Sequence, residues 1–297
     1  YYKESTPYKE PAPYKETTPL RAKPPRPAVK SAPFPPDITR GDMSMMEVAL
    51  TFDGGSGRTE ETAEILDALR ERSIRATVFL TGQFIRENPD AVRRMVADGH
   101  EVGNHTLTHL HLTTYARNYT HTTLEGVDSA VLTRELDGTE ALFREVTGRD
   151  MAPLWRAPYG EVNGALRRWA LEAGYVHIGW TSDYENRESL DTLDWVYDRS
   201  SRFYRSPEEI KGRVMNFGKN RGGVSGGIIL MHLNTRRTSD RAALMVGDML
   251  DALAGRGYRF VKVSTLIKGN QLLKEARSKR SELVASAGPT GAGVAHR

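Results

Sequence analysis

The sequence predicts an α/β fold in which helices cover a parallel β-sheet. Its apolar segments of strand length are too continuous to leave one face in water, which is typical of strands covered on both faces. These segments alternate with amphipathic segments of helical length. The alternation extends over about 230 of the 297 residues, which favours a closed β/α barrel over a small open sheet. An open, doubly wound sheet is the alternative architecture.

The individual elements follow from apolar runs and helix-start signals. VALTF, at 48–52, is the first strand, and Thr59 with Thr62 and neighbouring acids favours a helix start after it. An acidic segment, 183–198, follows the strand that ends at Trp180. The expected strands are 48–52, 76–80, 100–103, 174–180, 226–232 and 258–263, and the expected helices are 59–72, 90–98 and 241–255.

The two ends of the chain differ in composition from its middle. Residues 1–40 contain ten of the fifteen prolines and repeat Tyr-Lys-Glu three times, which predicts an extended, disordered spacer. The chain finishes in the low-complexity segment ASAGPTGAGVAHR, for which we also expect disorder. We therefore expect a spacer at 1–40, one folded domain at 41–270, and a basic, low-complexity tail at 271–297.

The charge distribution argues against a nucleic-acid-binding protein. Residues 1–40 carry eight Lys and Arg against four Asp and Glu, and residues 271–297 carry five against two. Since the whole chain has 42 basic and 38 acidic residues, its middle is slightly acidic. A nucleic-acid-binding domain would concentrate basic residues on its folded surface. The basic ends could contact anionic envelope polymers, and solvated flexible ends are the simpler alternative.

Composition also limits the chemistry and the location. The chain has no cysteine, which excludes disulfide bonds and thiolate metal sites. With 38% hydrophobic residues it can form a sizeable core. No stretch approaches the length of a membrane span, and no signal peptide is visible.

A single carboxylate, Asp53, ends the first expected strand and precedes Gly54 and Gly55. In a β/α barrel the loops after the strands converge at one mouth, where catalytic groups lie. Asp53 could instead cap the next helix. The two glycines appear where a substrate or metal would need close approach, which favours a functional carboxylate. The same criterion selects the residues that end later strands, Trp180, Asp183 and His232.

GNHTLTH, at 103–109, places two histidines four residues apart after an expected strand. On one helical turn, His105 and His109 would face the same side and could bind one transition metal. The pair is only moderately specific, because it lacks the glutamate of a HExxH motif and the chain has eight histidines. Apart from this pair and His232, which ends an expected strand, we interpret the histidines as ordinary polar or packing residues: His100, His111, His121, His177 and His296.

Five motifs occur in a fixed order: TFDGG, HTLTH, RAPYG, WTSD and LMH. Each is weak alone, and Arg156 within RAPYG would by itself be equally consistent with a surface ion pair. Together, over residues 46–265, they resemble the polysaccharide deacetylases, the carbohydrate esterase family 4 enzymes with a NodB-type domain. The resemblance implies a distorted, incompletely closed (β/α)7-type barrel that hydrolyses N-acetyl groups of amino sugars with a divalent metal.

The resemblance also implies roles for individual residues. Asp53 matches the catalytic base, Arg156 the arginine that orients it, and His232 the general acid. His105 and His109 match the metal ligands, for which zinc is expected first and cobalt or nickel are alternatives. Around the substrate, the resemblance implies an oxyanion-binding backbone N–H at Tyr159, an apolar wall of Leu230 and Trp180 for the acetyl methyl, and Asp183 in the fourth motif.

Two positions depart from the family pattern. The family usually has a second aspartate, its third metal ligand, where this chain has Gly54. Its fourth motif usually ends in Asp-Trp, and we align Asn186 and Arg187 with that pair. Three solutions are open for the metal site: Asp53 itself binds the metal, water completes the site, or another side chain such as Asp183 does.

The sequence thus predicts a metal-dependent deacetylase of an acetylated amino-sugar polymer, peptidoglycan or a chitin-like chain, at the cell envelope or secreted. The alternative is a catalytically silent carbohydrate-binding protein on the same scaffold, which Gly54 and Asn186 favour. Retention of Asp53, Arg156 and His232 favours the enzyme, because a binding protein needs neither a base nor an acid. An insertion near 111–130 either shapes substrate choice or is a solvated loop.

Overall fold

The computed structural model describes residues 33–56, 60–241 and 243–286. The chain divides into two compact units, Tyr1–Pro33 and Phe34–Arg297. The expected spacer at 1–40 therefore lies, up to residue 32, outside the described residues. Its last residues belong to the second unit, where Ile38 is buried and forms an isolated parallel bridge with Ile178. The second unit thus begins before residue 41.

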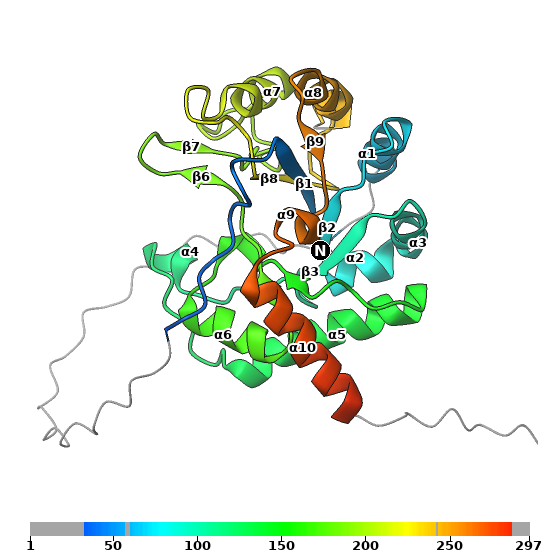
Figure 1. Cartoon of the computed structure of the whole chain (residues 1–297), viewed down its shortest axis with the longest axis vertical. Coiled ribbons are helices and arrows are strands. Elements are labelled where there is room, and N and C mark those ends of the chain that lie inside the picture. The colour runs from blue at the N-terminus through cyan, green and yellow to red at the C-terminus, as the bar shows by residue number, and fades with distance from the viewer. Residues whose placement is uncertain (1–32, 57–59, 242, 287–297) are drawn as a thin grey trace, which may run out of the picture. The chain divides into compact units, whose positions relative to one another are not determined.

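A parallel sheet occupies the centre of the second unit (Figure 1). Within the described ranges, seven strands form it in the order β5-β4-β3-β2-β1-β8, with β9 paired to β1, and every pair is parallel. The strands are β1 Glu47–Gly54, β2 Thr77–Leu80, β3 Glu101–Asn104, β4 Leu154–Trp155, β5 Val176–His177, β8 Gly227–His232 and β9 Arg259–Phe260. They confirm the six strand positions expected from the sequence and add β4.

The strands at the two ends of this order, β5 and β8, do not pair with each other. The chain after β5 spans the distance instead: the Thr181 N–H donates to the Ile228 carbonyl, and Asp191 forms an isolated parallel bridge with Leu230. An antiparallel hairpin of β6 Ser182–Asp183 and β7 Glu188–Ser189 lies within this connection. The distorted, incompletely closed α/β barrel is confirmed. The fully closed barrel that the repeat count favours is wrong.

Helices surround the strands in Figure 1. Their bounds are α1 Glu60–Glu71, α2 Gly82–Glu87, α3 Pro89–Ala97, α4 Tyr115–Asn118, α5 Ser129–Thr147, α6 Gly164–Glu172, α7 Pro207–Asn216, α8 Ala243–Gly255, α9 Val263–Leu266 and α10 Gln271–Ser286. On one side α8 contacts α1 and α7, and on the other α5 contacts α2, α3 and α6.

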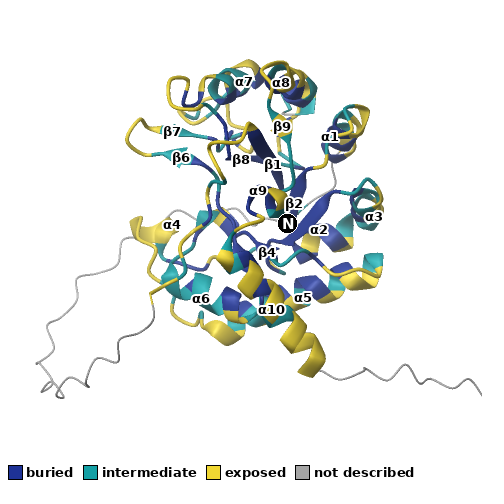
Figure 2. Cartoon of the chain, in the orientation of Figure 1, coloured by how far each residue is buried: buried dark blue, intermediate teal, exposed yellow. Residues whose placement is uncertain are grey.

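The central strands are buried on both faces (Figure 2). Successive side chains of a strand point to opposite faces. In β1, Leu50 and Phe52 belong to the core cluster under the surrounding helices, whereas Ala49 belongs to a second cluster with Phe79 and Ile228. The face that carries Ala49 also carries positions 51 and 53. The sequence of β1 therefore directs Asp53 into the interior of the barrel.

The C-terminal segment differs from the expected tail. Residues 271–286 form α10, which contacts α6 and β5. Leu273 and Ala276 are three residues apart, on one side of this helix, and both are buried in a core cluster. The rest of the expected tail, residues 287–297, lies outside the described residues. The long helix α5, at 129–147, is also absent from the helices expected from the sequence.

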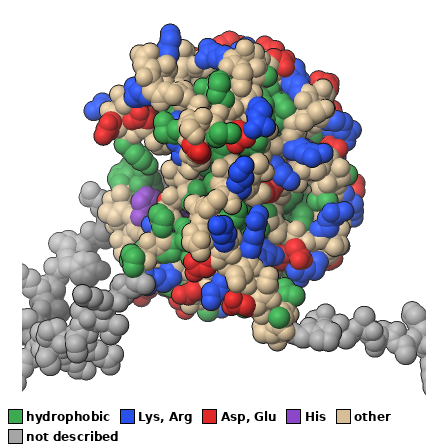
Figure 3. Space-filling model, in the orientation of Figure 1, with side chains coloured by type: hydrophobic (Ala, Val, Ile, Leu, Met, Phe, Trp, Pro, Cys, Tyr) green, Lys and Arg blue, Asp and Glu red, His purple; other side chains and the backbone are tan. Residues whose placement is uncertain are grey.

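No helix in the described parts of the chain is long and apolar enough to cross a membrane. On the face that Figure 3 shows, Lys and Arg side chains lie among Asp and Glu side chains. Neutralising the phosphates of a nucleic acid would require a continuous basic stripe. The surface in this view gives no support to nucleic-acid binding.

Candidate active site

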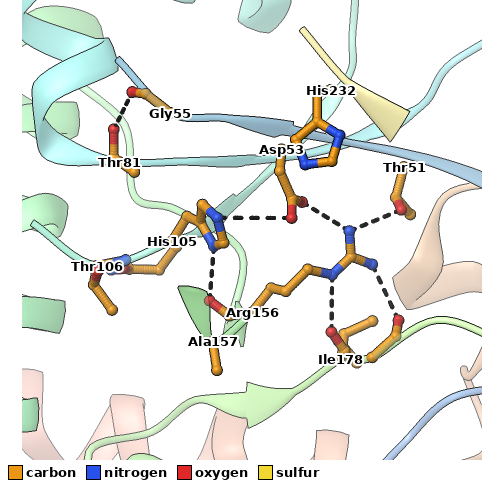
Figure 4. Close-up of polar contacts among 12 residues, drawn as sticks. Thr51, Asp53, Gly55, Thr81, His105, Thr106, Arg156, Ala157, Ile178 and His232 are labelled. Carbon is orange, nitrogen blue, oxygen red and sulfur yellow. Dashed lines mark hydrogen bonds and ion pairs between the residues drawn. The ribbon is translucent and has the colours of Figure 1, made fainter. Parts of the chain in front are cut away.

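Asp53 lies at the C-terminal end of β1 and is 5% exposed. Its partners in the strand register are Phe79 of β2 and His232 of β8. The strand ends therefore bring the carboxylate and the imidazole together, as Figure 4 shows. Asp53 and His232 therefore lie together at the C-terminal ends of neighbouring strands, where a barrel places its catalytic groups.

Arg156 follows β4 and is completely buried. Its Nη1 donates to Asp53 Oδ1 at 2.8 Å and to Thr51 Oγ1 at 2.9 Å. Nε and Nη2 donate to the carbonyls of Ile178 and Gly179 at 3.0 and 3.1 Å. Bonds in several directions fix the guanidinium, which in turn fixes the Asp53 carboxylate (Figure 4). The surface ion pair considered for Arg156 is wrong.

The surroundings of Asp53 favour its ionised form. Burial opposes ionisation, but the charge of Arg156 above all, and then that of His232, outweighs it and holds the pKa of Asp53 below its ordinary value. A carboxylate in this state is an acceptor for protons. Its Oδ1 is bound to Arg156, whereas Oδ2 lies 3.6 Å from His105 Nε2.

His105 follows β3 and is 3% exposed. Its Nδ1 lies 2.9 Å from the Arg156 carbonyl oxygen. A carbonyl oxygen only accepts, so Nδ1 carries the proton and Nε2 presents its lone pair. Burial lowers the pKa of His105, which keeps the ring neutral. A neutral imidazole whose other nitrogen donates to a carbonyl is the usual state of a metal-binding histidine.

His109 reaches the same site through an irregular loop. Its ring centroid lies 4.9 Å from that of His105. The expected helical turn is wrong, because Thr106 and His109 have positive φ of 67° and 56°. The left-handed backbone conformation of these two residues reverses the direction of the loop, and this brings the two imidazole rings together. Burial above all lowers the pKa of His109 to about 3, so this ring is neutral as well.

The donors at this point fit a divalent transition metal in chemistry but are few in number. Two neutral imidazoles lie beside an ionised carboxylate, the donor types that zinc prefers. Within the described ranges, however, no group of three or more His, Cys, Asp or Glu is arranged to hold a metal ion. His105 and His109 form the pair that could bind one, and Asp53 is the nearby carboxylate.

Gly54 does not leave room for a ligand. A Cβ at this position would lie 2.7 Å from Leu80 Cδ2 and 3.1 Å from Phe84 Cδ2. Both are core side chains. A side chain at residue 54 would point to the face of β1 opposite to the one that carries Asp53. The interpretation that both glycines clear space at the site is therefore corrected for Gly54. At Gly55 a Cβ would meet nothing within 4 Å.

His232 ends β8 and is held by a carboxylate that sequence reasoning missed. Asp194, which is fully buried, lies with Oδ1 2.7 Å from His232 Nδ1, and its Oδ2 accepts the His232 backbone N–H at 2.8 Å. Burial would lower the pKa of His232, but Asp194, and then Asp53, reverse this and raise it to about 9. The imidazole is therefore protonated at neutral pH.

Asp194 and Trp195 are an Asp-Trp pair whose carboxylate contacts His232 at the site, a place that we expected Asn186 and Arg187 to occupy. Asn186 lies in the turn between β6 and β7, where its Nδ2 donates to Asp183 Oδ2 at 2.8 Å. Asp183 also pairs with Arg221 at 3.0 Å. The structure thus places Asp183 in the hairpin and not beside Asp53. The dipeptide Asp-Trp at 194–195 is the sequence signal from which this pair could have been identified.

The remaining site candidates lie around this centre. Tyr159 adopts a positive φ of 59°, an unusual conformation for a non-glycine residue, and its ring centroid lies 4.5 Å from that of His109. Trp180 packs closely on the adjacent Gly160, where a Cβ would lie 2.7 Å from Trp180 Cη2. Leu230 is buried, two residues before His232, and therefore shares its interior face.

Comparisons with known proteins agree with this geometry. A family model described as polysaccharide deacetylase matches residues 40–178. A peptidoglycan-N-acetylglucosamine deacetylase of Bacillus cereus is 33% identical over 221 residues, 74% of this chain and 88% of that protein. A chitooligosaccharide deacetylase of Sinorhizobium fredii is 32% identical over 158 residues, 53% of this chain and 64% of that protein. The chain belongs to the polysaccharide deacetylase family.

Solved structures share the fold. The Bc1960 peptidoglycan N-acetylglucosamine deacetylase has a TM-score of 0.62 and 26% identity, covering 77% of this chain and 91% of that one. BA3943 of Bacillus anthracis, a CE4 family pseudoenzyme, has a TM-score of 0.61 and 25% identity, covering 78% and 69%. A BA3943 mutant with restored enzymatic activity has a TM-score of 0.62. These relatives place the chain among the carbohydrate esterases that hydrolyse amide bonds.

Proposed function

We propose that this protein is a metal-dependent N-deacetylase of a polysaccharide that contains N-acetylglucosamine. The observation that supports this best is the pairing at neighbouring strand ends: Arg156 donates to Asp53 Oδ1 at 2.8 Å, and Asp194 Oδ1 lies 2.7 Å from His232 Nδ1. Asp53 is held ionised, and His232 is held protonated. Amide hydrolysis needs a base to take a proton from water and an acid to give one to the departing amine.

In the proposed reaction, a water molecule attacks the carbonyl carbon of the acetyl group, and Asp53 takes one of its protons. The C–N bond then breaks as His232 gives its proton to the amine nitrogen, so the products are acetate and a free amino sugar. Arg156 occupies Oδ1 of Asp53, which leaves Oδ2 for the proton. The backbone N–H of Tyr159 would stabilise the oxyanion, a contribution of about 3–4 kcal/mol per donor in known sites.

The metal would be held by His105 and His109. Zinc is our first choice, with cobalt and nickel as alternatives, because all three bind imidazole well. When bound, such an ion supplies Lewis-acid polarisation of the amide carbonyl. Water is our candidate for the third ligand, since Arg156 occupies Oδ1 of Asp53 and Oδ2 takes the proton in the proposed reaction. Asp183 is not, because Asn186 and Arg221 bind its carboxylate.

The substrate assignment is supported by relatives that are named for different substrates. One is named for peptidoglycan and another for chitooligosaccharide, and both polymers contain acetylated amino sugars. Leu230 and Trp180 would form the apolar wall for the acetyl methyl. We place the activity at the cell envelope or outside the cell, where peptidoglycan lies. The proposed spacer, which would give reach, lies outside the described residues up to residue 32. Of the basic C-terminal end, which would contact anionic polymers, residues 271–286 form α10 and the rest lies outside the described residues.

A catalytically silent carbohydrate-binding protein is the competing function. Gly54 in place of a metal-binding aspartate favours it, and one structural neighbour is a pseudoenzyme. The argument from Asn186 no longer applies, because Asp194 supplies the carboxylate beside the acid. The retained acid, base and positioning arginine favour the enzyme.

Acetate release tests the proposal. The full chain is incubated with N-acetylglucosamine oligomers and with peptidoglycan, first with a chelator and then with added zinc, cobalt or nickel. We expect acetate only in the presence of metal, and its loss when the chelator returns. If neither substrate yields acetate with any of the three ions, the proposal is overturned in favour of a binding protein.

A further inference from the structure

The peptide bond between Arg156 and Ala157 is hydrogen-bonded to a different histidine at each of its two edges. We propose that His177 and Asp37 are positioning residues, which act through this peptide bond to keep His105 in the tautomer that can bind a metal. The inference rests on the proposed function and extends its metal site to two residues that lie outside the five motifs.

The first link joins the peptide bond to His105. The Arg156 carbonyl oxygen lies 2.9 Å from His105 Nδ1, and both residues are buried (Figure 4). Because this oxygen only accepts, the contact places the proton on Nδ1 and leaves the Nε2 lone pair for a metal. The carboxylate of Asp53 favours the other tautomer, since its Oδ2 lies 3.6 Å from Nε2 and would attract a proton there. The orientation of the Arg156 carbonyl therefore decides which tautomer His105 adopts.

The second link joins the same peptide bond to His177. The Ala157 N–H donates to His177 Nε2 at 3.2 Å, and Ala157 and His177 are 1% and 4% exposed. An N–H only donates, so Nε2 of His177 carries the lone pair and Nδ1 carries the proton. Rotation of the peptide plane would turn the carbonyl away from His105 and would leave a buried N–H without its acceptor, which is unfavourable.

The third link joins His177 to Asp37. Asp37 Oδ1 lies 2.6 Å from His177 Nδ1, so the imidazole donates to a carboxylate on one side and accepts the peptide N–H on the other. The ring of Trp155 also packs against His177, with centroids 5.0 Å apart. In this proposal His177 is more than the polar or packing residue that we expected from the sequence.

Asp37 is held in place by the backbone of its own segment. Ile38 forms an isolated parallel bridge with Ile178, and the Ile38 carbonyl accepts the Gly179 N–H at 2.9 Å. These contacts align the segment with the chain that continues from β5. Asp37 belongs to the part of the chain that we expected to be a spacer, and it instead lies against the folded unit.

Three hydrogen bonds therefore run in series from His105 to Asp37. In each of them the donor lies on the side of His105 and the acceptor on the side of Asp37. Hydrogen bonds that share one direction polarise one another, so the carboxylate strengthens the acceptor that the Arg156 carbonyl presents to His105. A stronger acceptor at Nδ1 makes Nε2 a better metal ligand.

The zinc affinity of the full chain tests the proposal without any turnover. Zinc is titrated into the metal-free protein in competition with a chelator of known affinity. We expect Asp37→Ala and His177→Ala to weaken zinc binding about tenfold, the lower end of the effect of removing a hydrogen-bond partner of a metal ligand. Asp37→Asn keeps an acceptor oxygen in a side chain of the same shape, so it should bind zinc more tightly than Asp37→Ala.

His100→Ala is the matched control. His100 is 7% exposed and, like His177, accepts a backbone N–H, that of Ala76 at 3.0 Å. It lies just before β3, at the opposite end of the strands from Asp53. The substitution therefore removes an equivalent imidazole but leaves the series intact, and zinc affinity should be unchanged. Thermal unfolding shows that each variant is folded, and Asp37→Ala is the mildest change, since this side chain is 30% exposed.

The tautomer of His105 is measured in the metal-free protein from the nitrogen chemical shifts of its ring, which are assigned from the signals that His105→Ala loses. We expect the Nδ1–H form in the unsubstituted chain and in His100→Ala, and a population of the Nε2–H form in Asp37→Ala and His177→Ala. The proposal is overturned if both of these variants keep the Nδ1–H form, if both keep the parental zinc affinity, or if His100→Ala changes either quantity equally.

The two proposals fail separately. If the unsubstituted chain releases no acetate with any metal but the tautomer of His105 depends on Asp37, the positioning role stands in a silent binding protein. If acetate is released and the tautomer depends on neither Asp37 nor His177, the deacetylase stands and the positioning role is wrong.

Discussion

At the scale of single residues, Asp194 determines the state of His232. It accepts the backbone N–H and faces Nδ1, at 2.8 and 2.7 Å, so one carboxylate both orients the ring and favours its protonated form. The surroundings of Asp53 favour the opposite proton state, since Arg156 stabilises the ionised form of this carboxyl group. Two groups whose environments drive their proton states apart are what acid–base catalysis at neutral pH requires.

We predict that Asp194→Asn shifts the alkaline limb of the activity profile to lower pH. His232 must be protonated to act as the acid, and its pKa of about 9 keeps it so until the pH rises through that value. Without the charge of Asp194, burial lowers the pKa, so activity is lost earlier as the pH rises. The measurement is kcat/KM against pH for acetate release at a fixed metal concentration.

Asp198→Asn is the control for this prediction, because Asp198 lies on the same segment but is exposed. Its alkaline limb should coincide with that of the unsubstituted enzyme. An unchanged limb in Asp194→Asn would show that His232 does not act as the acid in the way proposed.

At the scale of elements, β1 explains why a glycine follows the catalytic carboxylate. The strand alternates between two faces, so Asp53 points into the barrel while Gly54 points towards Leu80 and Phe84. Glycine is required there by packing between β1, β2 and α2. The same alternation in β8 places Leu230 and His232 on the interior face.

We predict that Gly54→Ala is about 1–3 kcal/mol less stable than Gly55→Ala, because added atoms in a filled core strain their neighbours. A Cβ would lie 2.7 Å from Leu80 at residue 54 but would meet nothing within 4 Å at residue 55. Both substitutions restrict the unfolded chain alike, so their difference isolates the packing effect. Urea unfolding of both variants measures it, and equal stabilities would contradict this account of Gly54.

At the scale of the whole molecule, the sequence predicted what depends on local patterns. The buried strands and the parallel sheet follow from apolar runs, and Asp53, His105 and His232 were selected because they follow or end expected strands. The place of Arg156 was implied only by the resemblance to the family. The sequence did not predict α10 as part of the domain, because two apolar residues on a polar helix are a weak signal. The pairing of Asp194 with His232 joins residues 38 apart and depends on how the chain returns after β5.

The backbone conformations of the loops at the site also could not be predicted from local sequence patterns. The spacing of His105 and His109 suggested a helix, but positive φ at Thr106 and His109 produces the same convergence in a loop. The stacking of Tyr159 on His111 joins segments 48 residues apart, held by Glu161. Such contacts are fixed by tertiary structure, which sequence periodicity does not report.

The most direct test of the central claim is acetate release by Asp53→Asn compared with the unsubstituted chain, on the same N-acetylglucosamine oligomer and with the same metal. Asn preserves the shape of the side chain but cannot take a proton, and loss of general base catalysis alone costs about 10²–10⁴-fold in rate. We predict at least the lower end of this loss. Release at the unsubstituted rate would contradict the assignment of Asp53 as the base.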